Sequence, residues 1–134
     1  MSNNAPIAGR RFPFVVVLAE KDAPTRATLA ALLSCDGCRV FQAEDLNAAI
    51  SWIDKLNEIA VLFVDIDMPG WESLVQHTLT TAPDTFVMAT AENEPIPEIS
   101  ELRRHGINLC LRKPLLYAYV RWVLSENVVG RCVA

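Results

Sequence analysis

The stretch "VLFVDIDMPGW" at residues 61–71 decides how the rest of the chain is interpreted. Its first four residues form a continuous apolar run, which is typical of a strand buried on both faces of a parallel sheet. The run stops at Asp65, a second acid follows at Asp67, and Met-Pro-Gly then favours a turn. A buried strand that opens into two carboxylates and a turn indicates a site at the carboxyl end of that strand.

The rest of the chain alternates short apolar runs with segments of helical spacing. Continuous or β-branched runs predict five strands, at residues 14–19, 38–43, 59–65, 85–91 and 107–114. Apolar residues at helical spacing, between capping and stop signals, predict five helices, at residues 24–35, 46–56, 71–82, 97–106 and 115–127. This strict alternation predicts an α/β fold with a parallel sheet, right-handed crossovers and helices on both faces of the sheet.

Composition indicates one globular domain and argues against several classes of protein. The length of 134 residues suits a single domain, and a content of 51% hydrophobic and 21% charged residues is typical of a folded chain. The net charge of −4 argues against nucleic-acid binding, which needs clustered Lys and Arg. No apolar run is long enough to span a membrane and the N-terminus lacks the apolar core of a signal peptide, so we expect a cytoplasmic protein.

We expect three parts along the chain. Residues 1–11 are rich in Ser, Asn, Ala and Gly and predict a flexible N-terminal arm. Residues 12–126 contain all the predicted strands and helices, and we interpret them as the folded domain. Residues 127–134 are expected to form a C-terminal tail.

In the cytoplasm the cysteines are expected to be free thiols. They are Cys35, Cys38, Cys110 and Cys132. The "CDGC" at residues 35–38 has the spacing of zinc and redox motifs, but zinc needs two more ligands and the chain has no second close Cys/His pair. Because Asp-Gly also ends a predicted helix at this point, we favour a structural role for the motif.

Polar side chains follow four of the predicted strands where those strands end. Glu20 follows the first strand, Asp65 ends the third, and Thr90 and Lys113 stand at the ends of the fourth and fifth. Carboxyl ends of parallel strands meet at one edge of a sheet, so we expect these side chains to converge. The set suits phosphoryl transfer to Asp65 as nucleophile, with a carboxylate-bound Mg²⁺, the Lys113 charge and the Thr90 hydroxyl stabilising the phosphoryl oxygens.

These fragments resemble the receiver domain of two-component response regulators. The matching residues are Glu20, "DIDMPG" at 65–70, "TA" at 90–91 and "KP" at 113–114, and the resemblance covers about residues 12–126. It implies a doubly wound five-stranded sheet of strand order 2-1-3-4-5. It also implies a signalling role, in which the chain takes a phosphoryl group from the histidine of a histidine kinase or histidine phosphotransfer protein and is not a turnover enzyme.

The resemblance also implies residue roles. Asp65 would be the phosphoacceptor, and Thr90, Ala91 and Lys113 would contact the phosphoryl group. Mg²⁺ would be held by Glu20, Asp65 and the backbone carbonyl of Asp67. The Lys113-Pro114 peptide bond is expected to be cis, as it usually is in that family.

One position departs from the family in a way that bears on metal binding. The family has two adjacent acids after its first strand, where this chain has Glu20-Lys21. Lys21 therefore replaces a metal-ligating acid, so Mg²⁺ binding is expected to be weak. Lys21 is instead expected to pair with Asp65 or with a free Asp67 carboxylate, in place of the missing cation.

A shifted register remains open, in which the acid pair is matched by Lys21-Asp22 and Asp22 is the alternative metal ligand. We prefer Glu20, because the apolar run ends at Ala19 and because Arg26 falls six residues after Glu20, as the family's common arginine does.

Two further features concern switching and assembly. Cys110 stands where the family commonly has an aromatic residue that rotates on activation, so aromatic switching is not expected. The family's usual partner surface corresponds to residues 97–106, 107–114 and 115–127, and we expect any homodimer to form there. On it the last helix offers Tyr117, Tyr119, Arg121 and Trp122.

Two alternative functions remain open. The first is a degenerate receiver, a protein-interaction module that needs no phosphate because Lys21 fixes one state. The second is a hydrolase of the haloacid-dehalogenase kind, since "FVDID" resembles the Asp-x-Asp motif of that family. That motif usually lies on the first strand and needs an acidic segment downstream, whereas here it lies on the third strand with no acidic pair after it.

Overall fold

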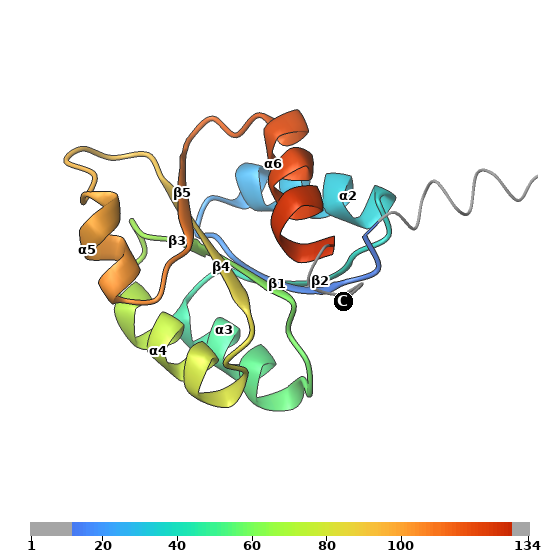
Figure 1. The fold of residues 1–134 in the computed structure, drawn as a ribbon, viewed down its shortest axis with the longest axis horizontal. Helices are drawn as coiled ribbons and strands as arrows, with labels where there is room; N and C mark the ends of the chain where they lie inside the picture. The colour runs from blue at the N-terminus through green and yellow to red at the C-terminus, as the bar shows by residue number, and fades with distance from the viewer. Residues whose placement is uncertain (1–11, 130–134) are drawn as a thin grey trace, which may run out of the picture.

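The computed structural model describes residues 12–129, which form one five-stranded sheet between two layers of helices (Figure 1). All strand pairs are parallel and the order is β2-β1-β3-β4-β5, which confirms the expected doubly wound sheet. The strands are β1 (Val15–Ala19), β2 (Arg39–Ala43), β3 (Val61–Asp65), β4 (Phe86–Ala91) and β5 (Leu109–Arg112). The helices are α2 (Ala23–Cys35), α3 (Leu46–Lys55), α4 (Trp71–Thr81), α5 (Ile99–Arg104) and α6 (Tyr117–Leu124), and the π-helical η1 (Ser125–Val129) continues α6.

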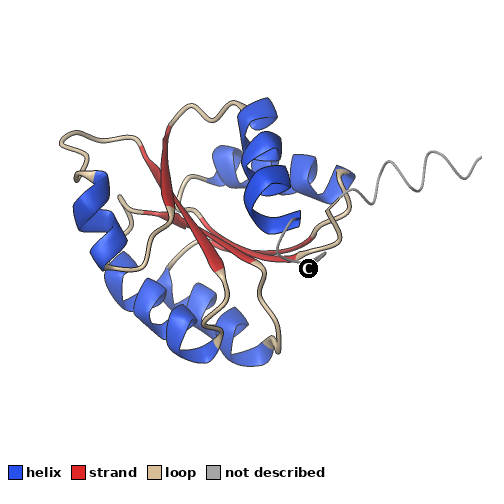
Figure 2. Ribbon diagram, viewed as in Figure 1, coloured by secondary structure: helices blue, strands red, loops and turns tan. Residues whose placement is uncertain are grey.

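The central strand β3 is buried along its whole length, as its apolar sequence predicts. Its successive side chains point to opposite faces of the sheet. Phe63 packs in the core beneath α2 and α6, whereas Leu62 and Val64 pack in the core beneath α3, α4 and α5. Figure 2 shows these two helix layers on opposite sides of the sheet. Alternate residues of each strand therefore contribute to the two cores, and the apolar faces of the helices cover them.

Local signals in the sequence set the helix boundaries. The Asp45 carboxylate accepts the backbone N–H of Ala48 at 2.8 Å, which confirms the predicted N-cap of α3. α4 begins after Gly70, which has a φ of 85°, a left-handed conformation that favours glycine. A Cβ at Gly70 would lie 2.7 Å from a methyl group of Leu46, so a larger residue in the Met-Pro-Gly turn would also have to displace the Leu46 side chain.

Some boundaries differ from the expected ones. α5 is shorter than residues 97–106, because two prolines precede it and Glu98 is its N-cap. At the other end of the chain, helical structure continues past residue 126 and Val128 is buried in the core, so the expected start of the tail falls inside η1. The expected arm at residues 1–11, the rest of the tail and Cys132 lie outside the described residues. No helix within residues 12–129 is long and apolar enough to cross a membrane.

The cysteines of the described segment are free thiols, as expected. Cys35 is exposed at the end of α2, whereas Cys38 is buried beneath it. Burial raises the pKa of Cys38 to about 12, so its thiol stays protonated and unreactive at neutral pH. The "CDGC" segment closes α2 at Asp36, which agrees with a structural role.

Candidate functional site

The carboxyl ends of four strands meet at the edge of the sheet where the strand order reverses, between β1 and β3. Asp65 ends β3 directly opposite Thr90 of β4. The backbone N–H of Lys113, just past β5, donates to the carbonyl of Ala91 at 2.8 Å. The backbone N–H of Glu20, just past β1, likewise donates to the carbonyl of Ala43. The sheet register therefore brings the residues predicted from the strand ends to one place.

A buried ion pair lies at the centre of this edge. The Lys113 Nζ lies 2.8 Å from each oxygen of the Glu20 carboxylate and 3.4 Å from Asp65 Oδ2. The side chains of Lys113, Glu20 and Asp65 are 7%, 2% and 0% exposed. One ammonium group thus serves two carboxylates that water does not reach.

Burial and pairing act in opposite directions on these groups. Burial raises the pKa of Glu20, and the hydrogen bonds from Lys113 and from the Asp22 N–H only partly offset that effect. Burial by itself acts to lower the pKa of Lys113, but the hydrogen bond that Lys113 donates to Glu20 and the Asp65 charge outweigh it and leave that pKa raised. Lys113 therefore stays protonated, and its ammonium group stabilises the buried charges of the Glu20 and Asp65 carboxylates.

The two oxygens of Asp65 have different environments. Oδ1 accepts the backbone N–H of Asp67 at 2.9 Å. Oδ2 is buried and has no hydrogen-bond donor within residues 12–129, although the Lys113 ammonium is near enough to attract it. A carboxylate oxygen with unshared lone pairs, fixed beside a cation, is a candidate nucleophile.

Asp67 makes contacts that differ from the prediction. Its carboxylate is not free to pair with Lys21, because Oδ2 accepts the backbone N–H groups of Glu92 at 2.8 Å and Asn93 at 3.2 Å. Lys21 Nζ instead reaches the backbone carbonyl of Asp67 at 3.4 Å, so the predicted side-chain pairing of Lys21 is wrong. The Asp67 side chain ties the loop after β3 to the loop after β4.

The structure also distinguishes the two possible registers after β1. Asp22 is the N-cap of α2, where its carboxylate accepts the Thr25 backbone N–H at 3.0 Å, and it is exposed. The Thr25 hydroxyl and N–H lower the pKa of Asp22. Arg26 Nη1 donates to the backbone carbonyl of Glu20 at 2.8 Å, which fixes the chain as it leaves β1. Glu20 is thus the acid inside the site, and Asp22 serves the helix.

The three groups expected to hold Mg²⁺ fit a divalent cation poorly as they are arranged. Both oxygens of Glu20 already face Lys113, and the carbonyl of Asp67 faces Lys21. Among the oxygens of these groups, Asp65 Oδ2 is the one left without a hydrogen-bond donor from the described residues. Within residues 12–129, no three His, Cys, Asp or Glu side chains are placed to share a metal. Mg²⁺ prefers several oxygen ligands in near-octahedral geometry, which this arrangement does not offer.

Cys110 and Trp71, which lie near this edge, have ordinary packing roles. Cys110 of β5 is partly buried against the core beneath α3, α4 and α5, and burial raises its pKa. Trp71, the first residue of α4, packs edge-on against His105 with ring centroids 5.1 Å apart.

The last helix divides into an inward and an outward side. The Tyr117 hydroxyl donates to the Asp36 carboxylate at 2.7 Å, and Arg121 Nε lies 3.1 Å from the same carboxylate oxygen. Tyr119 and Trp122 are exposed and stacked on each other at 5.7 Å. Of the four residues expected on the partner surface, two therefore fasten α6 to the end of α2. A homodimer through this face stays a prediction.

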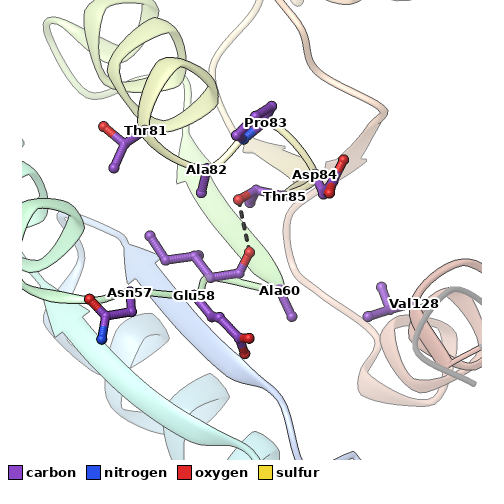
Figure 3. Close-up of a pocket in the computed structure, with 10 residues that line it drawn as sticks. Asn57, Glu58, Ala60, Thr81, Ala82, Pro83, Asp84, Thr85 and Val128 are labelled. Carbon is purple, nitrogen blue, oxygen red and sulfur yellow. Dashed lines mark hydrogen bonds between the residues drawn. The ribbon is translucent and has the colours of Figure 1, made fainter.

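One cavity lies apart from the buried carboxylates, and a second one borders Lys113, which pairs with them. A cleft of about 570 Å³ opens at the amino ends of β3 and β4, opposite the candidate site, and the Thr85 hydroxyl donates to the carbonyl of Ile59 across it (Figure 3). A smaller groove of about 280 Å³ runs between α2 and the segment after β5, where Lys113 and Pro114 form part of its wall. The Lys113-Pro114 bond is cis, as expected.

No family model and no curated protein matches this sequence. Solved structures match it well. NtrX from Brucella abortus in complex with ATP aligns over 91% of this chain with a TM-score of 0.80 and 17% identity, and this chain spans 28% of NtrX. A response regulator receiver domain protein from Clostridium thermocellum aligns over 90% of this chain and 98% of its own, with a TM-score of 0.79 and 15% identity.

A response regulator from Burkholderia pseudomallei with a phosphorylated aspartic acid aligns over 90% of this chain and 71% of its own. Its TM-score is 0.73 and its identity is 18%. Likeness at identities of this size is evidence about the fold. The element order, the strand order and these alignments agree, and the chain therefore has the fold of a response-regulator receiver domain.

Proposed function

We propose that the chain is a receiver module of two-component signal transduction, which accepts a phosphoryl group on Asp65 from a histidine kinase or a histidine phosphotransfer protein. The observation that carries the proposal is Asp65 Oδ2. It is a buried oxygen at the end of the central strand, without a hydrogen-bond donor in the described part of the chain, and with an ammonium group 3.4 Å away. A carboxylate that served only the fold would be expected to have both oxygens satisfied.

The chemistry needs little from the protein beyond position and charge. A lone pair of Asp65 Oδ2 attacks the phosphorus of a protonated phosphohistidine, and a P–O bond forms as the P–N bond breaks. The electron pair of the broken bond returns to the ring nitrogen, so the donor leaves as neutral imidazole. Lys113 supplies positive charge to the phosphoryl oxygens and Thr90 supplies a hydroxyl donor. Such a module changes its own state and turns over no substrate.

The comparisons support this proposal by analogy of fold. The Burkholderia pseudomallei response regulator carries a phosphorylated aspartic acid on the same architecture. A shared fold hosts many functions, so the function of this chain follows from its own site residues. Here the end of β3 carries the acid, and the ends of β1, β4 and β5 carry its partners.

The first prediction concerns the acceptor residue. Incubation with phosphoramidate, a small donor with a P–N bond, is expected to add one phosphoryl group to the protein, visible in the intact mass, and the Asp65→Asn variant is expected to gain none. Asp54→Asn is a matched control, because Asp54 is an exposed acid of α3 paired with His77. It should be modified like the wild type. An adduct that persists in Asp65→Asn would refute the assignment of the acceptor.

A second candidate function is a degenerate receiver that binds a partner without phosphate. The observation that favours it is the Lys21 contact with the Asp67 carbonyl, together with the closed pair of Glu20 and Lys113. These contacts already supply cations to the site. Absence of any phosphoryl adduct in the wild type, with phosphoramidate and with candidate phosphotransfer proteins, would favour this second function.

A further inference from the structure

We infer that the ammonium group of Lys21 substitutes for a divalent cation in this site, so that the wild-type chain does not respond to Mg²⁺ and the single change Lys21→Asp creates a metal site. The inference rests on the proposed function only in taking the edge of the sheet as a receiver site. Its evidence is the arrangement of charges around Asp65.

Lys21 is connected to the acceptor through the loop after β3. Its Nζ contacts the carbonyl of Asp67, and the N–H of the same residue donates to Asp65 Oδ1 at 2.9 Å. The ammonium thus lies at the carbonyl that the family resemblance assigns to the metal. An ammonium group has hydrogens to donate and no lone pair to offer, so it can bind this carbonyl but cannot ligate a cation.

The charges at this edge of the sheet are partly neutralised without a metal. The carboxylates of Glu20 and Asp65 face the ammonium group of Lys113, and the ammonium group of Lys21 lies at the neighbouring backbone carbonyl of Asp67. The third carboxylate, Asp67, is turned to the backbone N–H groups that begin the loop after β4, which stabilise its charge. A cation entering this site would meet the buried ammonium group of Lys113, the exposed ammonium group of Lys21 and few free oxygens, so its affinity is expected to be low.

The change Lys21→Asp reverses each of these conditions. It removes a positive charge, adds a carboxylate one residue after Glu20, and frees the Asp67 carbonyl. Because cation affinity follows the number and charge of oxygen ligands, we expect Mg²⁺ and Mn²⁺ to bind this variant at least about tenfold more tightly than the wild type. Lys21→Gln removes the charge without adding a strong ligand, so a smaller gain is expected.

The test is titration of the purified protein with Mg²⁺ or Mn²⁺. Binding is measured by isothermal titration calorimetry and by the shift in thermal unfolding temperature. Wild type should show no saturating response at millimolar metal, and Lys21→Asp should show one. Lys55→Asp is the matched control, since it makes the same change of charge at an exposed lysine on α3, 5.6 Å from the ring centroid of Trp52. It should behave like the wild type.

Saturating binding by the wild type, or an equal gain in Lys55→Asp, would overturn the inference. If Lys21→Asp fails to fold, which circular dichroism would show, the graded response of Lys21→Gln against the wild type decides the same point. These readouts do not require phosphorylation. A metal response confined to Lys21→Asp, combined with no phosphoryl adduct on the wild type, would leave the inference standing and reject the proposed function.

Discussion

Replacing Lys113 with methionine is expected to destabilise the protein by about 3–5 kcal/mol, the usual cost of breaking a buried ion pair. Methionine keeps much of the volume of the lysine stem, so the loss should reflect charge more than packing. It would leave Glu20 and Asp65 as two buried carboxylates that no longer share the ammonium group. Urea denaturation of the variant and the wild type at neutral pH measures the difference in the free energy of unfolding.

The destabilised variant should also depend on pH with a predictable sign. Burial already raises the pKa of Glu20 above its ordinary 4.5, and Lys113 acts to lower it. Without Lys113 that pKa rises further, so the folded state binds a proton more strongly than the unfolded state. The stability of Lys113→Met should therefore fall as the pH rises from 4.5 through the raised pKa, and recover as the solution is acidified.

The double variant Glu20→Gln, Lys113→Met is the control for this prediction. Removing Glu20, one of the two buried acids left without a cation, should restore a large part of the lost stability. Such non-additivity is expected when two residues interact directly. A loss below about 1 kcal/mol for Lys113→Met, which is the range of solvent-exposed pairs, would mean that the ion pair does not hold this edge together.

Replacing Asp67 with alanine is expected to release the loop that follows β4. The Asp67 carboxylate accepts the N–H groups of Glu92 and Asn93, and hydrogen bonds to a charged group contribute about 1.5–3 kcal/mol in favourable cases. Amide hydrogen exchange at these two positions should become faster in Asp67→Ala, whereas the amides of β3 should keep their protection.

In the same experiment, Asp67→Asn distinguishes the effect of the negative charge from the effect of the hydrogen bonds. Its side-chain oxygen can still accept one or both N–H groups, so exchange at Glu92 and Asn93 should fall between the wild type and the alanine variant. The ion pair between Glu94 and Arg112 also holds this loop and should be unaffected. Unchanged exchange in Asp67→Ala would show that the carboxylate is not what fixes the loop.

Asp67 also connects Asp65 to this loop, through a hydrogen bond at each end. Its N–H binds Asp65 Oδ1 and its carboxylate binds the start of the loop. A change at Asp65 can therefore reach the loop through one residue. Cys110 stands where the family has its rotating aromatic residue, and the Asp67 contacts offer one path that does not need it.

The fold could be predicted from the sequence because its signals are local and repeated. β3 shows this best, since its apolar run predicts a doubly buried strand and its terminal acid predicts the edge of the site. The rule that strand ends converge then placed Glu20 and Lys113 near Asp65, although they are far apart in the chain. Each of these inferences needs only the period of the pattern and the direction of the strands.

The contacts of the longer side chains could not be predicted in the same way. The Asp67 carboxylate meets N–H groups of a loop 25 and 26 residues away, and nothing in its own segment indicates the position of that loop. The inward turn of Tyr117 and Arg121 likewise depends on Asp36 at the far end of another helix. Such contacts depend on the packed arrangement of several elements, which a linear pattern does not encode.

Phosphorylation of the wild type by phosphoramidate, with Mg²⁺ and then with an excess of chelator, tests the central claim most directly. We expect one phosphoryl group on Asp65 in both conditions, to a similar extent, because Lys113 and Lys21 already supply the positive charge. Lys21→Asp, run in parallel, should need Mg²⁺. An adduct on the wild type that forms only with Mg²⁺, or no adduct in either condition, would contradict the account.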